Sequence, residues 1–398
     1  MRKPLPIILV CILVLSTVAC GKTVAVPDAA GATAAASAVD TAGVSAGDSV
    51  ENSVDGAVAE SAGNSADATS GDSGGVSETR VFTDSVGRQV KLPSHIDRIA
   101  LSGPMAQIVL YALAPEKLVG FSEDWTADAS RYIPEEYLAL PTIGQLYGGK
   151  SEINLEELLA TGAQVVIDVG SPKGSITEDL NALQEQTGIP FIHVTMTIEN
   201  SGDAFRMLGD LLGIPERAEE FAVYCEDTYA RTKEIAESVD KKKALYILGD
   251  EGLNVIAAGS YHAEVIDLLT DNLAVVDEPS AKGTGNEVDM EQIFTWNPDV
   301  IIFAPDSIYG EVSEMPEWQN ISAIRTGEYY EVPFGPYNWM GFPPSIQRYL
   351  GMLWLSDILY PEKCDYDLRE EVVKYYKMFY HCDLTDVQYE ELIRNSVK

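Results

Sequence analysis

The sequence predicts an α/β protein, and three observations predict it. After Arg80, short β-branched runs alternate with segments of helical periodicity, which is the pattern of α/β layering. The strand-like runs fall into two sets, one in residues 80–213 and one in residues 243–398. Between the sets lies the clearest helical pattern of the chain, over residues 214–242. We therefore expect two Rossmann-like lobes that are joined by one long helix, with a ligand cleft between them.

The N-terminal segment has the features of an export signal. Arg2 and Lys3 precede an apolar run, residues 5–18, that is too short to span a bilayer comfortably. The order Leu15-Ser16-Thr17-Val18-Ala19-Cys20 resembles a bacterial lipoprotein signal, in which the cysteine becomes the acylated first residue. We expect residues 1–20 to be a lipoprotein signal peptide and Cys20 to anchor the protein to the cell membrane on its outer side. A secretory signal in which Cys20 is incidental is the alternative.

Residues 21–79 are expected to be a disordered, low-complexity tether. They consist mainly of Ala, Ser, Gly, Val and Asp, and the stretch from Lys22 to Glu78 has no aromatic residue. Such a composition buries too little apolar surface to offset the entropy of ordering. As a coil the tether would reach roughly 40 Å. A folded domain on this tether would stay near the membrane and could still reorient.

The composition of the whole chain excludes some partners. Its net charge of −35 argues against nucleic acid and against adhesion to anionic lipid surfaces, both of which need basic patches. Cys225, Cys364 and Cys382 lack the spacing of a metal site. Buried thiols are the expectation for these three residues, and a Cys364–Cys382 disulfide is the alternative.

The two lobes are predicted element by element. In the N-terminal lobe we expect strands at 98–101, 164–169 and 191–194 and helices at 105–113 and 177–187. In the C-terminal lobe we expect strands at 244–248, 299–303 and 330–332 and a helix at 263–269. The joining helix begins with Pro215, a residue suited to the first helical turn, and lysines lie at its end. It would be a rod of roughly 39 Å that permits only limited hinge motion.

A repeated sequence pattern, which we call the internal echo, indicates two related halves. Residues 151–156 run through a short helix into a strand at 165–167, and residues 286–291 run through another into a strand at 300–302. Glu156 and Glu291 hold matching places in the two copies, as do Glu152 and Glu287. A helix that enters a strand often looks like this, which is the simpler explanation.

Several segments, in order, resemble the substrate-binding proteins of ABC importers for iron-siderophores, haem and cobalamin, a helical-backbone class of periplasmic binding protein. They are residues 82–93, 98–102, 113–120, Asn154-Leu155-Glu156, Met290-Glu291-Gln292-Ile293 and Trp296-Asn297-Pro298-Asp299-Val300-Ile301. The resemblance covers about residues 81 to 380. The sequence departs from it at Gly162-Ala163-Gln164-Val165, where the family usually has Pro-Asp.

The resemblance implies a monomer that captures a chelate or macrocycle outside the cell and delivers it to an ABC permease and its ATPase. It also implies that one surface glutamate on each lobe pairs with arginines of the permease, and these positions fall at Glu156 and Glu291. The alternative is that both are exposed glutamates that favour the helix dipole. Neither catalysis nor an intrinsic cofactor is expected.

A large chelated ligand needs aromatic walls and a few aimed polar groups, and candidates occur on loops at strand ends. Expected ligand-binding residues of the N-terminal lobe are Ser102, Met105, Trp125, Tyr147, Lys150 and Lys173. Those of the C-terminal lobe are Tyr261, His262, Tyr309, Tyr337, Trp339 and Arg348. The loop Phe334–Pro344 is the densest in aromatic residues, and either it covers the core or it forms a wall of the site. Arg348 would pair with an anionic ligand group or cap a neighbouring carboxylate.

The identity of the ligand stays open at this point. A siderophore supplies all the oxygens around its iron, so that the protein binds no metal directly. Haem would need an axial ligand, for which Met105, His262, Tyr147 or Tyr337 are of suitable type. The other histidines, His95, His193 and His381, are scattered along the sequence. A siderophore-type iron chelate is the first choice, and haem or a corrinoid is the second.

An exported chelatase or metal-dependent hydrolase is the rival from another class. The sequence has no G-x-S-x-G elbow, no H-E-x-x-H, no phosphate-cradling glycine loop and no dinucleotide-binding fingerprint. A surface adhesin or sensor that kept a binding fold is a third interpretation. Stoichiometric binding without turnover would favour the substrate-binding protein over the enzyme.

Overall fold

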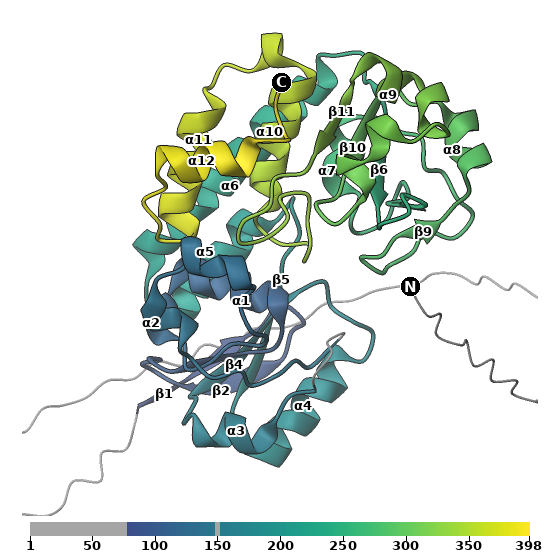
Figure 1. The fold of residues 1–398 in the computed structure, drawn as a ribbon. Helices are drawn as coiled ribbons and strands as arrows, with labels where there is room; N and C mark the ends of the chain where they lie inside the picture. Colours follow the sequence, from purple (N-terminus) through teal and green to yellow (C-terminus); the bar gives the residue numbers. More distant parts are fainter. Residues whose placement is uncertain (1–77, 148–151) are drawn as a thin grey trace, which may run out of the picture. The chain divides into compact units, whose positions relative to one another are not determined.

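A computed structural model of the chain describes residues 78–147 and 152–398 (Figure 1). The expected signal peptide with Cys20, the tether up to residue 77 and Lys150 lie outside these described residues. The described chain holds a three-stranded sheet, a six-stranded sheet and a two-stranded ribbon. Both lobes of the α/β fold expected from the sequence are therefore present.

The N-terminal lobe is built on a parallel sheet in the order β3-β4-β5. Its strands are β3 (Ile99–Leu101), β4 (Val165–Gly170) and β5 (Phe191–Thr195). Helices α1 (Pro104–Leu113) and α5 (Ser201–Leu212) cover one face, and α3 (Leu155–Ala160) and α4 (Ile176–Thr187) cover the other (Figure 1). Because both faces are covered, every residue of β4 is buried. The short α2 (Glu135–Leu138) completes this lobe.

An antiparallel ribbon precedes this sheet. Strands β1 (Thr79–Thr83) and β2 (Gln89–Pro93) pair with Thr79 opposite Pro93, and the turn between them runs over residues 84–88. The Ser85 backbone N–H donates to the His193 carbonyl at 3.0 Å, so that the turn is fixed to β5.

The C-terminal lobe is built on the larger sheet, in the order β11-β10-β6-β7-β9, with β8 paired to β6. Its strands are β6 (Lys243–Leu248), β7 (Asn254–Val255), β8 (Asp271–Asn272), β9 (Asn286–Glu287), β10 (Val300–Phe303) and β11 (Tyr329–Glu331). Its helices are α7 (Glu264–Leu269), α8 (Met290–Trp296) and α9 (Ser322–Thr326). The three strands that the sequence predicts, β6, β10 and β11, lie side by side and parallel.

The joining helix is α6 (Pro215–Glu237), 23 residues and about 34 Å long. It begins at Pro215 as expected. It ends five residues before the expected boundary of 242, because the chain turns after Ser238 and enters β6 at Lys243. Its buried stripe includes Phe221 and Cys225.

The two lobes are also connected by helices near the C-terminus, which the expectation of a single rod did not include. These are α10 (Arg348–Leu359), α11 (Leu368–Phe379) and α12 (Asp386–Ile393). Helix α10 packs on α6, and α11 packs on α1 of the N-terminal lobe. The Tyr111 hydroxyl donates to the Tyr380 carbonyl at 3.1 Å. This packing restricts motion between the lobes more than α6 alone would.

The three cysteines of the folded part, Cys225, Cys364 and Cys382, are free thiols. The alternative of a Cys364–Cys382 disulfide is therefore not realised. Burial raises the pKa of all three thiols. Among the helices of the described residues, none has the length and apolar character needed to cross a membrane.

Candidate functional site

The N-terminal lobe has a hollow at the carboxyl ends of its strands, which is where ligands bind in open α/β sheets. The hollow holds about 150 Å³. We call it the N-lobe hollow, and its lining residues are Ser102, Gly103, Pro104, Met105, Tyr147, Asp168, Val169, Gly170, Ser171, Lys173 and Ile176. The loop from β3 into α1 forms one side, and the end of β4 with the segment leading into α4 forms the other.

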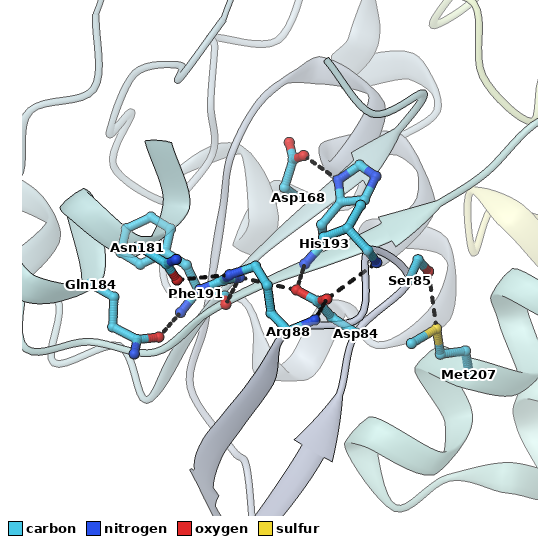
Figure 2. A network of polar contacts seen from close by, with 10 residues as sticks. Asp84, Ser85, Arg88, Asp168, Asn181, Gln184, Phe191, His193 and Met207 are labelled. Carbon is cyan, nitrogen blue, oxygen red and sulfur yellow. Dashed lines mark hydrogen bonds and ion pairs between the residues drawn. The ribbon is translucent and has the colours of Figure 1, made fainter. Parts of the chain in front are cut away.

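A row of three polar residues crosses the sheet at this hollow. Asp168 pairs with His193 in the register of β4 and β5, and Ser102 directly follows Leu101, which pairs with Ile167. The His193 Nδ1 atom lies 2.6 Å from Asp168 Oδ2 (Figure 2). The Ser102 hydroxyl donates to Asp168 Oδ1. Serine contacts the carboxylate and not the imidazole, so the three residues do not form the relay of a serine hydrolase.

A buried ion pair lies behind this row. The Arg88 Nη1 atom is 3.0 Å from Asp84 Oδ2 and donates to the Phe191 carbonyl at 2.8 Å (Figure 2). The Arg88 Nε–H donates to Asn181 Oδ1 at 2.9 Å. Asp84 Oδ2 also accepts the His193 backbone N–H at 3.3 Å. The pair thus fixes the strand that carries His193.

The rim of the N-lobe hollow carries Tyr147 and Lys173. The Tyr147 hydroxyl donates to Asp179 Oδ2 at 2.7 Å, and Lys173 Nζ lies 3.9 Å from the centroid of the Tyr147 ring. Burial, followed by the hydrogen bond to Asp179, raises the pKa of Tyr147. The same hydrogen bond lowers the pKa of Asp179, and the charge of Lys173 lowers it further. Lys173 therefore already faces a carboxylate.

The C-terminal lobe has a larger hollow of about 480 Å³ at the carboxyl ends of β6 and β10. We call it the C-lobe hollow, and its lining residues are Leu248, Gly283, Ala304, Pro305, Asp306, Phe334, Asn338 and Phe342. Most of this wall is aromatic or aliphatic. The Asn338 Nδ2–H donates to the Tyr246 hydroxyl at 3.0 Å, so that the amide is held in place.

The side of the C-lobe hollow at Phe342 is backed by His262 and Arg348. The His262 ring stacks on Phe342 with centroids 4.8 Å apart, and His262 Nδ1 lies 3.1 Å from the Gly341 carbonyl oxygen. Burial lowers the pKa of His262, so the imidazole is neutral at neutral pH. Arg348 is buried and pairs with Glu264, and its guanidinium carbon lies 5.4 Å from the centroid of the Tyr261 ring. Of the two roles considered for Arg348, the structure contains the pairing with a neighbouring carboxylate, that of Glu264.

A narrow space of about 10 Å³ lies where residues of the two lobes meet. Residues of the N-terminal lobe, Met105, Met196, Ile198 and Ser201, line it together with Ser345, Ile346, Arg348 and Tyr349. Met105 also lines the N-lobe hollow.

The structure separates the candidate residues into three groups. Ser102, Met105, Tyr147 and Lys173 line the N-lobe hollow, and Tyr261, His262 and Arg348 lie behind the wall of the C-lobe hollow. Four others belong to packed clusters and line neither hollow, namely Trp125, Tyr309, Tyr337 and Trp339.

In the structure, these four residues pack against other side chains. Trp125 packs against Tyr111, Phe121 and Tyr337 with centroids 5.2 to 5.7 Å apart. Trp339 is fully buried in the core. Tyr309 packs on Phe303 and Tyr329 at the β10–β11 edge. Large aromatic surfaces gain more from burial in the core than from a place on a loop surface.

Sequence reasoning missed Asp168, Phe334, Asn338 and Phe342. The last three belong to the aromatic loop that the sequence singles out, and their spacing of four residues was a usable signal. The signal for Asp168 was a carboxylate inside the β-branched run of β4.

The two glutamates of the internal echo occupy the same place in their helices. Glu156 is the second residue of α3 and Glu291 the second of α8, and both are exposed. Asn154 and Asp289 cap these helices by accepting backbone N–H groups. Three residues after each glutamate lies an exposed apolar side chain, Leu159 at 51 % exposure and Phe294 at 54 %. Each pair lies on one helix face, because residues three apart are neighbours there.

Metal ligation was searched over residues 78–147 and 152–398. In that part of the chain, no three His, Cys, Asp or Glu side chains gather closely enough to hold a metal ion.

Comparison with known proteins gives consistent matches. The model of a family described as periplasmic binding protein matches residues 107–335. The molybdate-binding protein MolA of Haemophilus influenzae is 26 % identical over 331 residues, which are 76 % of this chain and 91 % of that protein.

Two solved structures have a similar fold over nearly their whole length. An ABC transporter solute binding protein from Sulfurospirillum deleyianum has a TM-score of 0.71 and 27 % identity, over 79 % of this chain and 99 % of that one. A periplasmic solute binding protein from Veillonella parvula has a TM-score of 0.67 and 28 % identity, over 80 % and 98 %.

Proposed function

Because the chain belongs to the periplasmic binding protein family, we propose that it captures an iron chelate of the siderophore type and delivers it to an ABC permease. As an ABC transporter solute-binding protein, it works outside the cytoplasm on a small-molecule ligand. A lipid on Cys20 would keep it near the permease and its ATPase. The ligand would be released unchanged, and no intrinsic cofactor would be needed.

The observation that carries this choice of ligand is the C-lobe hollow. Its volume of about 480 Å³ falls in the range of roughly 300–1,000 Å³ that is usual for organic ligands. Phe334, Phe342 and Leu248 offer apolar surface that the organic shell of a chelate would bury. A bare oxyanion gains nothing from such a wall, because it needs hydrogen-bond donors and positive charge.

The charges at the hollows favour a chelate of low net charge. Lys173 and Arg348 each face a carboxylate already, Asp179 and Glu264 respectively. A highly anionic tris-catecholate complex would have to draw these cations away from their partners. A ferric trihydroxamate core is neutral, because three hydroxamate anions balance the charge of Fe(III). The ferric trihydroxamates are therefore the preferred subclass.

Molybdate is a second candidate, and the observation that favours it is the similarity to MolA of Haemophilus influenzae. A tetrahedral oxyanion would suit the smaller N-lobe hollow in size. Haem or a corrinoid of the same importer class remains an alternative ligand. Met105 and Tyr147 are the axial-ligand types that line the N-lobe hollow, and the Tyr147 hydroxyl donates to Asp179. His262 is held by Gly341 and Phe342.

The surface that would meet the permease consists of the Glu156–Leu159 pair on α3 and the Glu291–Phe294 pair on α8. The support is that exposed carboxylates recur at the same helix position in both lobes, each beside an exposed apolar side chain. The carboxylates would pair with arginines of the permease, and the apolar side chains would be covered on docking.

The test is a titration of the protein followed by tryptophan fluorescence. The ligands are a ferric trihydroxamate, a ferric tris-catecholate, haemin, cobalamin and molybdate, and the iron-free trihydroxamate serves as the control. We expect saturation at one equivalent with the ferric trihydroxamate and recovery of the chelate unchanged. Binding of molybdate alone would overturn the proposal in favour of an oxyanion carrier, and consumption of the chelate would indicate an enzyme.

A further inference from the structure

The N-lobe hollow contains a buried carboxylate, that of Asp168, which the capture of a bulky chelate does not explain. Asp168 lines the hollow with its side chain 12 % exposed, and the neighbouring strands place Ser102 and His193 on either side of it. A carboxylate can accept about four hydrogen bonds, and these two neighbours supply two. The remaining acceptor capacity of Asp168 is available to the hollow that it lines.

Beyond Asp168, the described chain gives the His193 ring no hydrogen-bond partner. The His193 side chain is buried, and its Nε2 atom has no hydrogen-bond partner within the described chain. A positive charge on this ring would leave a charged N–H unpaired at a buried position, which is costly. The Asp168 carboxylate is therefore the charged group that the row Ser102–Asp168–His193 presents to the hollow.

Two sources of positive charge border the same hollow, and each acts on it less strongly than the Asp168 carboxylate. The N-terminus of α1 contributes about half an elementary charge, and Pro104 at its start has no N–H to offer. Lys173 carries a full charge, but its side chain is exposed and lies over Tyr147 near Asp179. Solvent screens an exposed charge far more than a buried one. The buried floor of the hollow is negative on balance.

From this geometry we infer that the N-lobe hollow is a subsite for a protonated amine of the ligand, with Asp168 as its counter-ion. The inference rests on the proposed function, since it adds an aminoalkyl group to the chelate. The N-lobe hollow of about 150 Å³ fits such a group, and the chelate core belongs in the larger C-lobe hollow. The Ser102 hydroxyl and the His193 ring hold the Asp168 carboxylate in position.

The experiment compares two ligands that differ only in this charge. Ferrioxamine B is a linear ferric trihydroxamate with a free amine, and acetylation of that amine gives a neutral counterpart with the same iron core. A charge-assisted hydrogen bond is worth enough to expect about ten- to one-hundred-fold tighter binding of the amine form. The Asp168→Asn variant should bind both forms with the affinity that the unmodified protein has for the acetylated one.

Control variants separate this role from a general effect of charge or folding. Asp97→Asn removes one exposed charge away from the lining of both hollows and should keep the preference for the amine. If Asp168→Asn does not fold, the two ligands still test the inference on the unmodified protein.

The outcomes distinguish the inference from the function on which it rests. Equal affinity of the unmodified protein for both forms overturns the amine subsite and leaves chelate capture in place. Loss of the preference in Asp306→Asn but not in Asp168→Asn would place the amine in the C-lobe hollow and would also overturn it. If neither form binds, the proposed function fails and the inference fails with it.

Discussion

For the buried Asp84–Arg88 ion pair, we predict that removing Asp84 destabilises the fold more than removing Arg88. The Asp84 side chain is fully buried and that of Arg88 is 6 % exposed. Asp84 accepts backbone N–H groups from Val86 at 3.2 Å, from Arg88 at 2.8 Å and from His193 at 3.3 Å, in addition to the guanidinium. Without Arg88, the carboxylate would therefore keep three donors. Without Asp84, the guanidinium would be left with two uncharged acceptors, the Phe191 carbonyl and Asn181.

The expected losses in the free energy of unfolding follow from this difference between the two partners. Asp84→Ala leaves a buried charge without a counter-ion, which lowers the free energy of unfolding by about 3–5 kcal/mol. Arg88→Met removes the guanidinium and its hydrogen bonds to Asp84, Asn181 and the Phe191 carbonyl, but it leaves the Asp84 carboxylate with three backbone donors and fills most of the space, so that the loss is about 1.5–3 kcal/mol. Asp97→Ala is the matched control. It breaks the Lys117–Asp97 pair, in which Asp97 is 77 % exposed, and should cost less than about 1 kcal/mol.

The assay is urea unfolding of each variant, followed by far-ultraviolet circular dichroism at one pH and one salt concentration. We expect the order Asp84→Ala, then Arg88→Met, then Asp97→Ala, from most to least destabilised. An Arg88→Met variant as unstable as Asp84→Ala would contradict this order, because it would show that the three backbone donors do not compensate the Asp84 carboxylate.

Three further predictions concern the site and the surface. Phe342→Ala should weaken binding of the ferric trihydroxamate about ten-fold in a fluorescence titration, since it removes an apolar wall of the C-lobe hollow, whereas Tyr309→Phe, in the packed core, should not. The double variant Glu156→Ala with Glu291→Ala should bind the chelate normally and lose uptake by whole cells; unchanged uptake would remove both residues from docking. Because burial raises its pKa, Cys364 should react with iodoacetamide more slowly than free cysteine at pH 8, and the rate should rise with pH; a rate equal to that of free cysteine would contradict this.

The fold was predictable where burial dictates the residue type. Parallel strands covered on both faces are nearly continuous apolar runs, and this pattern predicted β10 and, apart from Asp168, β4. The end of α6 was harder to predict. Lys241–Lys243 suit a helix C-terminus, but Lys243 starts β6, because pairing with β8 and β10 determines where that strand begins.

The candidate site was less predictable, because a loop without periodicity does not reveal which side chains face inward. In the aromatic loop, Trp339 packs into the core while Phe334 and Phe342 line the hollow, and composition alone cannot separate them. The row at the N-lobe hollow depends on strand register. Asp168 and His193 are 25 positions apart in the sequence, and only the pairing of β4 with β5 makes them neighbours.

We propose that the protein holds an intact iron chelate and does not transform it. Native mass spectrometry of the protein mixed with a slight excess of ferric trihydroxamate measures this directly. We expect a single adduct with the mass of one complete ferric chelate, which dissociates on heating to return the same chelate. An adduct with the mass of iron alone, of a chelate fragment or of molybdate from the growth medium would overturn the proposal.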